Sequence, residues 1–159
     1  MDEHAKSTAL TQFTYGIYLV GSRSGDDVNL MTANWLTQTS FDPPYLCVAI
    51  QEDAHTRKLI DAGHVFNIQN VPSGSKDLLL KFVKPAEKVG NKLEGEDFVE
   101  APTTKTPVLA AALSYVECEV EQAIPTGGHI LYIGRIVGAG VQHEGAAITM
   151  AETGMHYAG

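Results

Sequence analysis

The sequence has little that points to secretion, membrane insertion or nucleic-acid binding. Only Cys47 and Cys118 are cysteines, and we expect both as buried thiols rather than as a disulfide. No apolar run approaches the roughly 18 residues of a membrane-spanning helix, and the first residues, MDEHAKSTAL, lack the basic and apolar regions of a secretory signal. The net charge of −8 disfavours nucleic acid and anionic membranes, because phosphate binding needs a basic surface. We therefore expect a cytoplasmic protein with neither kind of partner.

The chain also lacks repeats, low-complexity segments and an evident linker. Hydrophobic residues make up 44 % of it and charged residues 19 %, as in ordinary globular proteins. One domain over residues 1–159 is expected, with any flexibility confined to residues 1–10. No GxGxxG follows a strand, so a Rossmann dinucleotide site is not expected. No His, Cys or carboxylate group has metal-ligand spacing, and no metal site is predicted.

Most of the periodic signal is typical of β-strands. Short runs of aromatic and β-branched residues end in turn-prone residues, and residues 113–123 alternate acidic and apolar side chains. The segments expected as strands are 15–22, 29–38, 45–51, 65–71, 113–123, 129–139 and a short piece at 147–150. Helices are expected at 55–62, which stops at Gly63 as a C′ residue, and at 75–83, with Ser73 as its cap. Many short strands and few helices predict a mainly β, barrel-like fold.

The segment 29–44, NLMTANWLTQTSFDPP, carries the most chemical information. Asn, Thr, Gln and Ser are interleaved there with small or bulky apolar residues. A strand that only fills a core needs few amides and hydroxyls, whereas a strand that lines a polar planar ligand needs many. A solvated edge strand explains the same composition, so both interpretations stay open.

A basic cluster follows at residues 54–58, AHTRK, where a predicted strand passes into a predicted helix. Free amides at a helix N-terminus, together with a Thr hydroxyl and an Arg, can bind a phosphate. The alternative is that Arg57 and Lys58 only face water on the helix surface. Both segments together indicate a ring-contacting strand followed by a phosphate-binding turn.

These segments resemble the flavin reductase-like family, whose members are FMN-binding split β-barrels. In that family a pattern N-x-x-T-x7-S-x-x-P-P forms the flavin wall, and Asn29, Thr32, Ser40, Pro43 and Pro44 fall on it. Similar segments are YGIYLVGS, AHTRKLI, TGGHILYIGRIV and the closing ETGMHYAG, the last resembling a subgroup related to flavodiiron-type proteins. The resemblance covers about residues 14–159. It implies a mainly β, Greek-key-like split barrel with two or three short helices.

The resemblance also implies a role for each matching residue. The residues that it places along the isoalloxazine and ribityl chain are Met31, Thr32, Ala33, Asn34, Trp35 and Thr37. Ser40 follows near the ribityl phosphate, and the phosphate is held by His55, Thr56 and Arg57. Trp35 can equally be a barrel or interface residue.

His129 corresponds to a family histidine that faces the flavin and the incoming nicotinamide. The family commonly has Gly-Asp-His here, whereas this chain has Gly127-Gly128-His129, so the carboxylate is missing. The alternative is that His129 only begins a strand and makes a structural hydrogen bond. His64 is expected to cap a turn and His143 to be solvated. For His156, the resemblance places the C-terminal tail near the flavin and leaves open whether this side chain contacts it.

Three functions remain in competition after the resemblance. The first is an FMN-binding NAD(P)H:flavin oxidoreductase, a homodimer in which His129 is the catalytic residue and NADH or NADPH the reductant. The second is an FMN-binding electron-transfer protein served by a protein redox partner, which the missing carboxylate favours. The third is a non-catalytic split-barrel module that binds haem or another planar ligand, or none.

Overall fold

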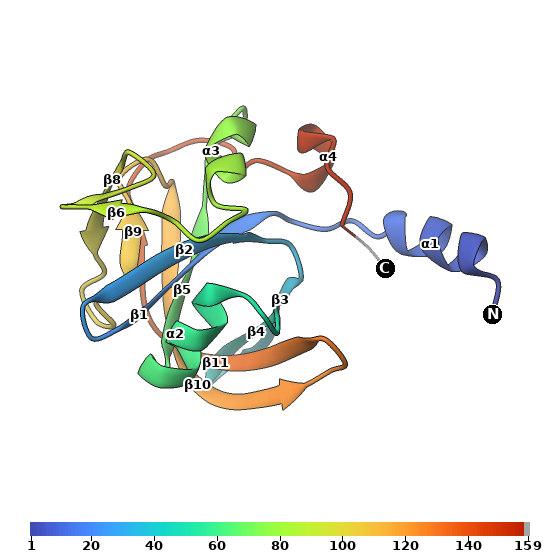
Figure 1. Ribbon diagram of the computed structural model, residues 1–159, viewed down its shortest axis with the longest axis horizontal. Helices are drawn as coiled ribbons and strands as arrows, with labels where there is room; N and C mark the ends of the chain where they lie inside the picture. The colour runs from blue at the N-terminus through green and yellow to red at the C-terminus, as the bar shows by residue number, and fades with distance from the viewer. Residues whose placement is uncertain (158–159) are drawn as a thin grey trace.

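The computed structural model describes residues 1–157, in which strands predominate (Figure 1). The described elements, in chain order, are α1 (Glu3–Thr11), β1 (Tyr18–Ser24), β2 (Asp27–Ala33), β3 (Leu36–Phe41), β4 (Pro44–Gln51), α2 (His55–Gly63), β5 (Val65–Asn70), α3 (Lys76–Lys81), β6 (Lys88–Val89), β7 (Lys92–Leu93), β8 (Glu96–Glu100), β9 (Pro107–Leu109), β10 (Ser114–Pro125), β11 (His129–Val141) and α4 (Met150–Thr153). The strands predicted at 15–22, 45–51, 65–71, 113–123 and 129–139 correspond to β1, β4, β5, β10 and β11 within three residues.

Seven strands form one antiparallel sheet in the order β2-β1-β5-β10-β11-β4-β3. The sheet curls without closing, so that β2 and β3 are its two edges. A smaller sheet, in the order β6-β7-β8-β9, lies against the β1–β2 end. The expectation of a mainly β split barrel is confirmed.

The single strand predicted at 29–38 is wrong, because the chain turns between β2 and β3. The turn holds Asn34 and Trp35, where the Leu36 amide donates to the Asn34 carbonyl at 3.2 Å. The Trp35 carbonyl accepts instead from Ala49 of β4 at 3.0 Å. Polar and apolar residues are interleaved without a break over 29–38. The sequence therefore did not reveal that the chain passes there from one edge strand of the sheet to the other.

Two apolar cores lie on opposite faces of the sheet. Successive residues of β1 contribute to different cores: Leu19 packs with α3 and the small sheet, and Val20 packs inside the barrel. Helix α2 covers the barrel core with Ile60, beside the fully buried Phe66 of β5. Burial on both faces explains why β1 and β5 have continuous rather than alternating buried positions.

Helix α2 begins at His55 as predicted but ends differently. The helix includes Gly63, and the left-handed residue that ends it is His64, with φ 55°. His64 thus caps the turn, as expected of it, by donating its amide to the Ile60 carbonyl at 2.8 Å. Gly63 is required for contact instead: a Cβ there would lie 2.0 Å from the Arg23 carbonyl oxygen.

Two other local expectations are corrected near the C-terminus. Ser75, not Ser73, is the N-cap residue of α3, and the Ser73 hydroxyl contacts Glu152. The strand expected at 147–150 is only two isolated bridges, at Ala147 and Thr149, after which α4 begins. A Thr149 side chain that accepts from the Glu152 amide favours the helix there.

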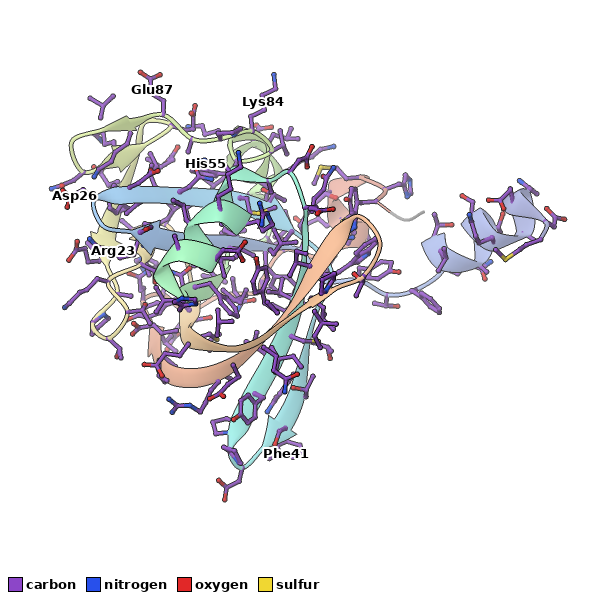
Figure 2. All side chains as sticks on the ribbon, turned by 60° about the horizontal axis from the view of Figure 1, so that its bottom comes forward. Arg23, Asp26, Phe41, His55, Lys84 and Glu87 are labelled. Atoms are coloured by element: carbon purple, nitrogen blue, oxygen red, sulfur yellow. The ribbon has the colours of Figure 1, made fainter. Side chains whose placement is uncertain are left out.

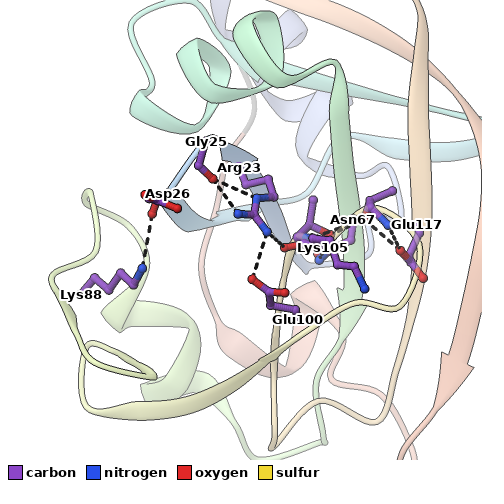
Figure 3. Close-up of polar contacts among 10 residues, drawn as sticks. Arg23, Gly25, Asp26, Asn67, Lys88, Glu100, Lys105 and Glu117 are labelled. Carbon is purple, nitrogen blue, oxygen red and sulfur yellow. Dashed lines mark hydrogen bonds and ion pairs between the residues drawn. The ribbon is translucent and has the colours of Figure 1, made fainter.

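Sequence periodicity missed helix α1 and the small sheet. Asp2 caps α1 by accepting from two backbone amides, although no α1 residue is buried. The small sheet is held to the β1–β2 turn by polar contacts (Figure 3). Arg23 donates to Glu100 and to the Lys105 carbonyl, both at 3.0 Å, and Lys88 donates to the Asp26 carbonyl at 3.3 Å. Flexibility of residues 1–10 stays a prediction.

The two cysteines lie in different environments. Cys118 is fully buried, as expected, whereas Cys47 is only half-buried, contrary to expectation. Burial, together with the Glu117 charge, raises the pKa of Cys118 to about 12.

None of the helices within residues 1–157 is long and apolar enough to span a membrane.

Candidate functional site

A cavity of about 520 Å³ opens where the end of β2, the start of α2 and the C-terminal segment meet. Its volume is within the range of small-molecule and cofactor sites. The lining combines apolar, amide, hydroxyl and imidazole groups from segments far apart in the sequence. The lining residues are Ile17, Asn29, Met31, Thr32, Ala33, Asn34, Ala49, Gln51, Asp53, Ala54, His55, Thr56, Phe82, Val83, Lys84, Pro85, His129, Met150, Met155, His156 and Tyr157.

The structure brings most of the sequence-predicted site residues to this cavity. Those that line it are Met31, Thr32, Ala33, Asn34, His55, Thr56 and His129. Four others, Trp35, Thr37, Ser40 and Arg57, do not line it. Their proposed contacts with a flavin stay predictions.

Asn29 holds three segments of the wall together. Its amide nitrogen donates to the Thr56 hydroxyl oxygen at 2.7 Å, and its amide oxygen accepts from Ala86 at 2.8 Å. Both side chains are buried. Because the Thr56 oxygen accepts from Asn29, the Thr56 O–H is left to donate to a ligand. The sequence pattern included Asn29, but only the contacts show this positioning role.

Both hydrogen-bond donors of Thr32 are engaged within the protein, and the contact of its side chain with a flavin stays a prediction. Its hydroxyl donates to the Leu79 carbonyl at 2.7 Å, and its amide donates to the Phe82 carbonyl at 3.0 Å. Both donors therefore tie β2 to the end of α3. Thr32 shapes the wall, which leaves ligand contact to its remaining surface.

Among residues 1–157, no side chain caps the backbone amides at the start of α2. Its N-cap residue, Ala54, supplies no side-chain hydrogen bond, and its first turn has no acidic residue. The first-turn amides and the positive end of the helix dipole are therefore suited to an anion. His55 lies at this terminus, with its Nε2 atom 3.5 Å from an Asp27 carboxylate oxygen.

Lys84 adds a cation that the sequence reasoning missed. It is exposed at the cavity rim, and Figure 2 shows it on the same side of the molecule as His55. The Asp53 carboxylate lines the same cavity and partly offsets this positive charge. Lys84 follows α3 in a segment without recognisable periodicity, so no local signal identified it.

Arg57 is directed toward its own helix. Its Nη1 atom lies 2.5 Å from Asp61, whose second carboxylate oxygen accepts from the Tyr132 hydroxyl. Burial and the Asp61 hydrogen bond raise the pKa of Tyr132. Within residues 1–157, the Arg57 Nε atom is buried without a hydrogen-bond partner. Asp61 thus joins α2 to Tyr132 of the barrel core, and Arg57 pairs with Asp61 within the helix.

Thr37 and Ser40 lie on β3, in a hairpin that projects from the molecule. Phe41 at its tip is 91 % exposed, and Figure 2 shows this tip on the side opposite Lys84. The turn at Asn34 and Trp35 sends β3 away from the cavity, which is why no residue of β3 lines it.

Three aromatic rings gather beside the cavity. The ring centroids of Trp35 and His129 are 4.8 Å apart, and those of Trp35 and Tyr157 are 5.2 Å apart. Trp35 therefore packs on the side chain that the sequence analysis singled out as catalytic. His156 lines the cavity, whereas His143 is exposed and its Nε2 lies 2.8 Å from the Ala110 carbonyl oxygen. Within residues 1–157, no group of three His, Cys, Asp or Glu residues is placed to hold a metal ion.

Comparison with known sequences gives one family. Residues 10–159 match the family described as flavin reductase like domain. An uncharacterised protein of Pyrococcus abyssi is 37 % identical over 122 residues, which cover 76 % of this chain and 70 % of that protein. A diflavin flavoprotein of Synechocystis is 26 % identical over 152 residues. The chain spans about a quarter (26 %) of that protein's length, in an alignment covering 94 % of this chain.

Solved structures share the fold. The styrene monooxygenase flavin reductase of Pseudomonas putida is 26 % identical, with a TM-score of 0.72 and 89 % of each chain covered. An FMN-binding protein of Thermus thermophilus is also 26 % identical, with a TM-score of 0.71 and coverage of 84 % of this chain and 74 % of that one. The flavin reductase component of a bacterial tryptophan halogenase has a TM-score of 0.79 at 21 % identity, covering 96 % of this chain and 95 % of that one.

Proposed function

Because the chain belongs to the family of flavin reductase-like domains, we propose that it binds FMN in the 520 Å³ cavity and catalyses hydride transfer to it from NADH or NADPH. The observation that carries this proposal is one cavity that joins the end of β2 to the uncapped start of α2. The first offers backbone and apolar surface for a planar ring, and the second offers amides for a phosphate.

The donor set fits both ends of a flavin mononucleotide. At the phosphate end, the first-turn amides of α2 and the Thr56 O–H donate, while Lys84 supplies positive charge. At the ring end, residues 31–34 of β2 and the following turn line the cavity together with Ala49 of β4. Phosphate and ring would thus be held by groups that the fold fixes before binding.

When bound, a flavin supplies the redox chemistry, accepting a hydride at N5 and later passing electrons to an acceptor. The chain's own task is to bind, orient and stabilise charge. Backbone N–H groups near the pyrimidine edge of the ring would stabilise negative charge on the reduced cofactor. His129 lines the cavity and can donate to an acceptor on the flavin or the nicotinamide.

The loop before His129 has a backbone conformation that suits its two glycines. Gly127 and Gly128 have φ values of 69° and 108°, a region that favours glycine. An aspartate at position 128 would be strained in this conformation. The absent carboxylate removes one polar contact that a nicotinamide could use, so the electron-transfer alternative retains support.

The electron-transfer alternative is a second candidate function. The Synechocystis relative is named a diflavin flavoprotein, and a Moorella thermoacetica relative that is 30 % identical is named a high molecular weight rubredoxin. Both names describe redox proteins. In this alternative, FMN stays bound and a protein partner exchanges electrons with it.

A homodimer is part of the proposal. The exposed Phe41 projects on the β3–β4 hairpin, and Thr37 and Ser40 lie on this hairpin, outside the cavity of their own subunit. A second copy placed on this hairpin would give these residues a role at the site. Sedimentation velocity of the intact chain tests the oligomeric state, and a purely monomeric protein would contradict this part of the proposal.

One set of titrations separates the alternatives. FMN, FAD and riboflavin are titrated into the purified protein by absorbance, and NADH and NADPH oxidation is then followed with FMN bound. Saturable FMN binding with nicotinamide oxidation supports a reductase. Binding without oxidation supports electron transfer with a protein partner. Absence of any flavin binding by a folded protein refutes both and leaves the non-catalytic module.

A further inference from the structure

The C-terminal segment forms part of the cavity wall. Met150, Met155, His156 and Tyr157 line the 520 Å³ cavity and also a second cavity of about 300 Å³, whose other wall is residues 11–15. The segment therefore separates the two cavities. The sequence motifs assigned no role to Tyr157.

Hydrogen bonds fix the start of this segment. The Glu152 carboxylate accepts from the Ser73 hydroxyl at 2.9 Å and from the Gly74 amide at 2.5 Å. The buried Thr153 hydroxyl donates to the Met150 carbonyl at 2.7 Å and accepts from the Met155 amide at 3.0 Å. These contacts determine where the chain leaves α4 and so direct it toward β2.

Tyr157 is in contact with two other parts of the site. Its carbonyl accepts from the Asn34 side-chain amide at 3.2 Å, and its hydroxyl lies 3.0 Å from His129 Nε2. Its ring also packs 5.2 Å from that of Trp35. One residue thus links the β2–β3 turn to the start of β11.

The contact with His129 is linked to which ring nitrogen carries the proton. In a neutral pair, either the phenol O–H donates to a bare Nε2 or an Nε2–H donates to the phenol oxygen. The first arrangement is favoured because the phenol O–H is the stronger donor and the bare imidazole nitrogen is the stronger acceptor. Nε2 is then without hydrogen, and the proton of the ring is on Nδ1. Among residues 1–157 no hydrogen-bond partner is found for His129 Nδ1, so its N–H remains for an acceptor on a ligand.

We propose that Tyr157 is a positioning residue of this site, whose hydroxyl holds the His129 imidazole in the Nδ1–H tautomer and in a fixed orientation beside the cavity. Trp35 packs against the same imidazole and limits its rotation. The identity of the ligand acceptor rests on the proposed function, whereas the tautomer and its dependence on Tyr157 do not.

The first test uses the ligand-free protein. Long-range proton–nitrogen NMR spectra, recorded on the alkaline side of the histidine titration, show which ring nitrogen is protonated, and His129→Gln assigns the signal. We expect Nδ1–H in the wild type and a shift toward Nε2–H, the tautomer that predominates in water, in Tyr157→Phe. Tyr115→Phe, which removes a hydroxyl elsewhere in the chain, should leave the His129 signal unchanged.

A wild-type protein with Nε2–H at His129, or a Tyr157→Phe variant with an unchanged signal, would overturn the inference. Either result leaves the proposed function untouched, because no flavin or nicotinamide is present. Conversely, a protein that shows the expected tautomer but never binds FMN would refute the function alone.

The second test separates positioning from packing in the holoprotein. Tyr157→Phe keeps the ring and its contact with Trp35, so FMN affinity should stay within twofold of the wild type. The kcat/KM for the nicotinamide should fall about three- to tenfold, as expected for the loss of one neutral hydrogen bond. An equal loss of FMN affinity and kcat/KM would indicate a structural role and contradict the proposal.

Discussion

The protein has two polar clusters in its interior, and they use their hydrogen-bonding groups differently. One is the closed cluster, which lies between β1, β5, β10 and the loop before β9. Its members are Asn67, Gln69, Thr104, Thr106 and Glu117, all buried. The other is the open cluster around the 520 Å³ cavity, with Asn29, Thr32, Asn34, Thr56 and His129.

In the closed cluster, the side-chain amides and one carboxylate oxygen of Glu117 have hydrogen-bond partners within the protein. Asn67 donates to the Thr106 hydroxyl at 2.8 Å and to the Pro107 carbonyl at 2.9 Å, and its amide oxygen accepts from Gly21 at 3.1 Å and from Gln69. A Cβ on Gly21 would lie 2.6 Å from the Asn67 oxygen, so this approach requires glycine. Glu117 accepts from two backbone amides and a hydroxyl of the loop 103–104.

The open cluster has hydrogen-bonding groups without partners in the described part of the chain. The Thr56 O–H, the first-turn amides of α2 and the Nδ1 atom of His129 have no acceptor or donor assigned to them among residues 1–157. Satisfied buried polar groups specify a fold, whereas aligned groups with spare capacity beside a cavity indicate a ligand. The comparison therefore predicts stability effects from one cluster and binding effects from the other.

The largest effect is expected from Asn67→Ala. It would leave the Gly21 amide, the Gln69 amide and the Pro107 carbonyl with fewer partners in a buried site, so the free energy of unfolding should fall by about 3 kcal/mol. Urea unfolding measures this loss, and FMN affinity of the folded fraction should not change. Asn70→Ala, which removes one half-buried hydrogen bond on the same strand, should cost about 1 kcal/mol. Equal losses would contradict the distinction.

A smaller effect is expected from Lys84→Ala in the open cluster. Loss of a cation at the cavity rim should weaken FMN binding about ten- to thirtyfold and leave riboflavin, which lacks the phosphate, within twofold. Fluorescence titration measures both affinities. Lys88→Ala removes a lysine outside the cavity and serves as the control.

Arg57→Ala sharpens the same comparison. Because Arg57 pairs with Asp61 and lies outside the cavity lining, its removal should affect FMN and riboflavin equally. A selective loss of FMN affinity would restore Arg57 to the phosphate site that the sequence analysis assigned to it.

The buried thiol of Cys118, in the barrel core, gives a prediction of how stability depends on pH. The unfolded thiol ionises near pH 9 and the folded one near pH 12, so the folded state binds the proton more strongly. Stability from this thiol is complete below pH 9 and falls as the pH rises toward 12, by about 1.4 kcal/mol at pH 10. Thermal unfolding of the wild type and Cys118→Ala between pH 8 and pH 10 should show a steeper decline in the wild type. Parallel declines would contradict the prediction.

The smallest effect is expected from Thr56→Val. It removes the hydroxyl hydrogen that Asn29 leaves free, together with the oxygen that accepts from Asn29, and should weaken FMN binding about threefold to fivefold. Thr56→Ser retains the hydroxyl and should bind within twofold of the wild type. Isothermal titration calorimetry measures both, and similar losses in the two variants would indicate a packing effect instead.

The sequence allowed the strands and part of the site to be predicted. Alternation and turn residues located five strands, and family resemblance brought His55, Thr56 and His129 to attention before their contacts were known. All of these signals are local, because they depend on neighbouring residues along the chain.

What the sequence did not reveal depends on contacts between distant segments. Lys84 and Tyr157 reach the cavity only because α3 and α4 end beside β2. Asn34 and Trp35 look like any two residues of a strand, yet they turn the chain from one sheet edge to the other. The strands of the small sheet are two to five residues long and carry too few residues for a periodic signal.

The turn at Asn34 and Trp35 places the cavity beside the connection between the two edges of the sheet. The two edge strands, β2 and β3, meet in sequence at this turn, and Asn34 lines the cavity while the Trp35 carbonyl accepts from β4. A molecule bound there would contact β2 and the turn that leads into β3. Occupancy of the site should therefore slow amide hydrogen exchange along β2 and at this turn, and should leave the exposed tip of the β3–β4 hairpin unchanged.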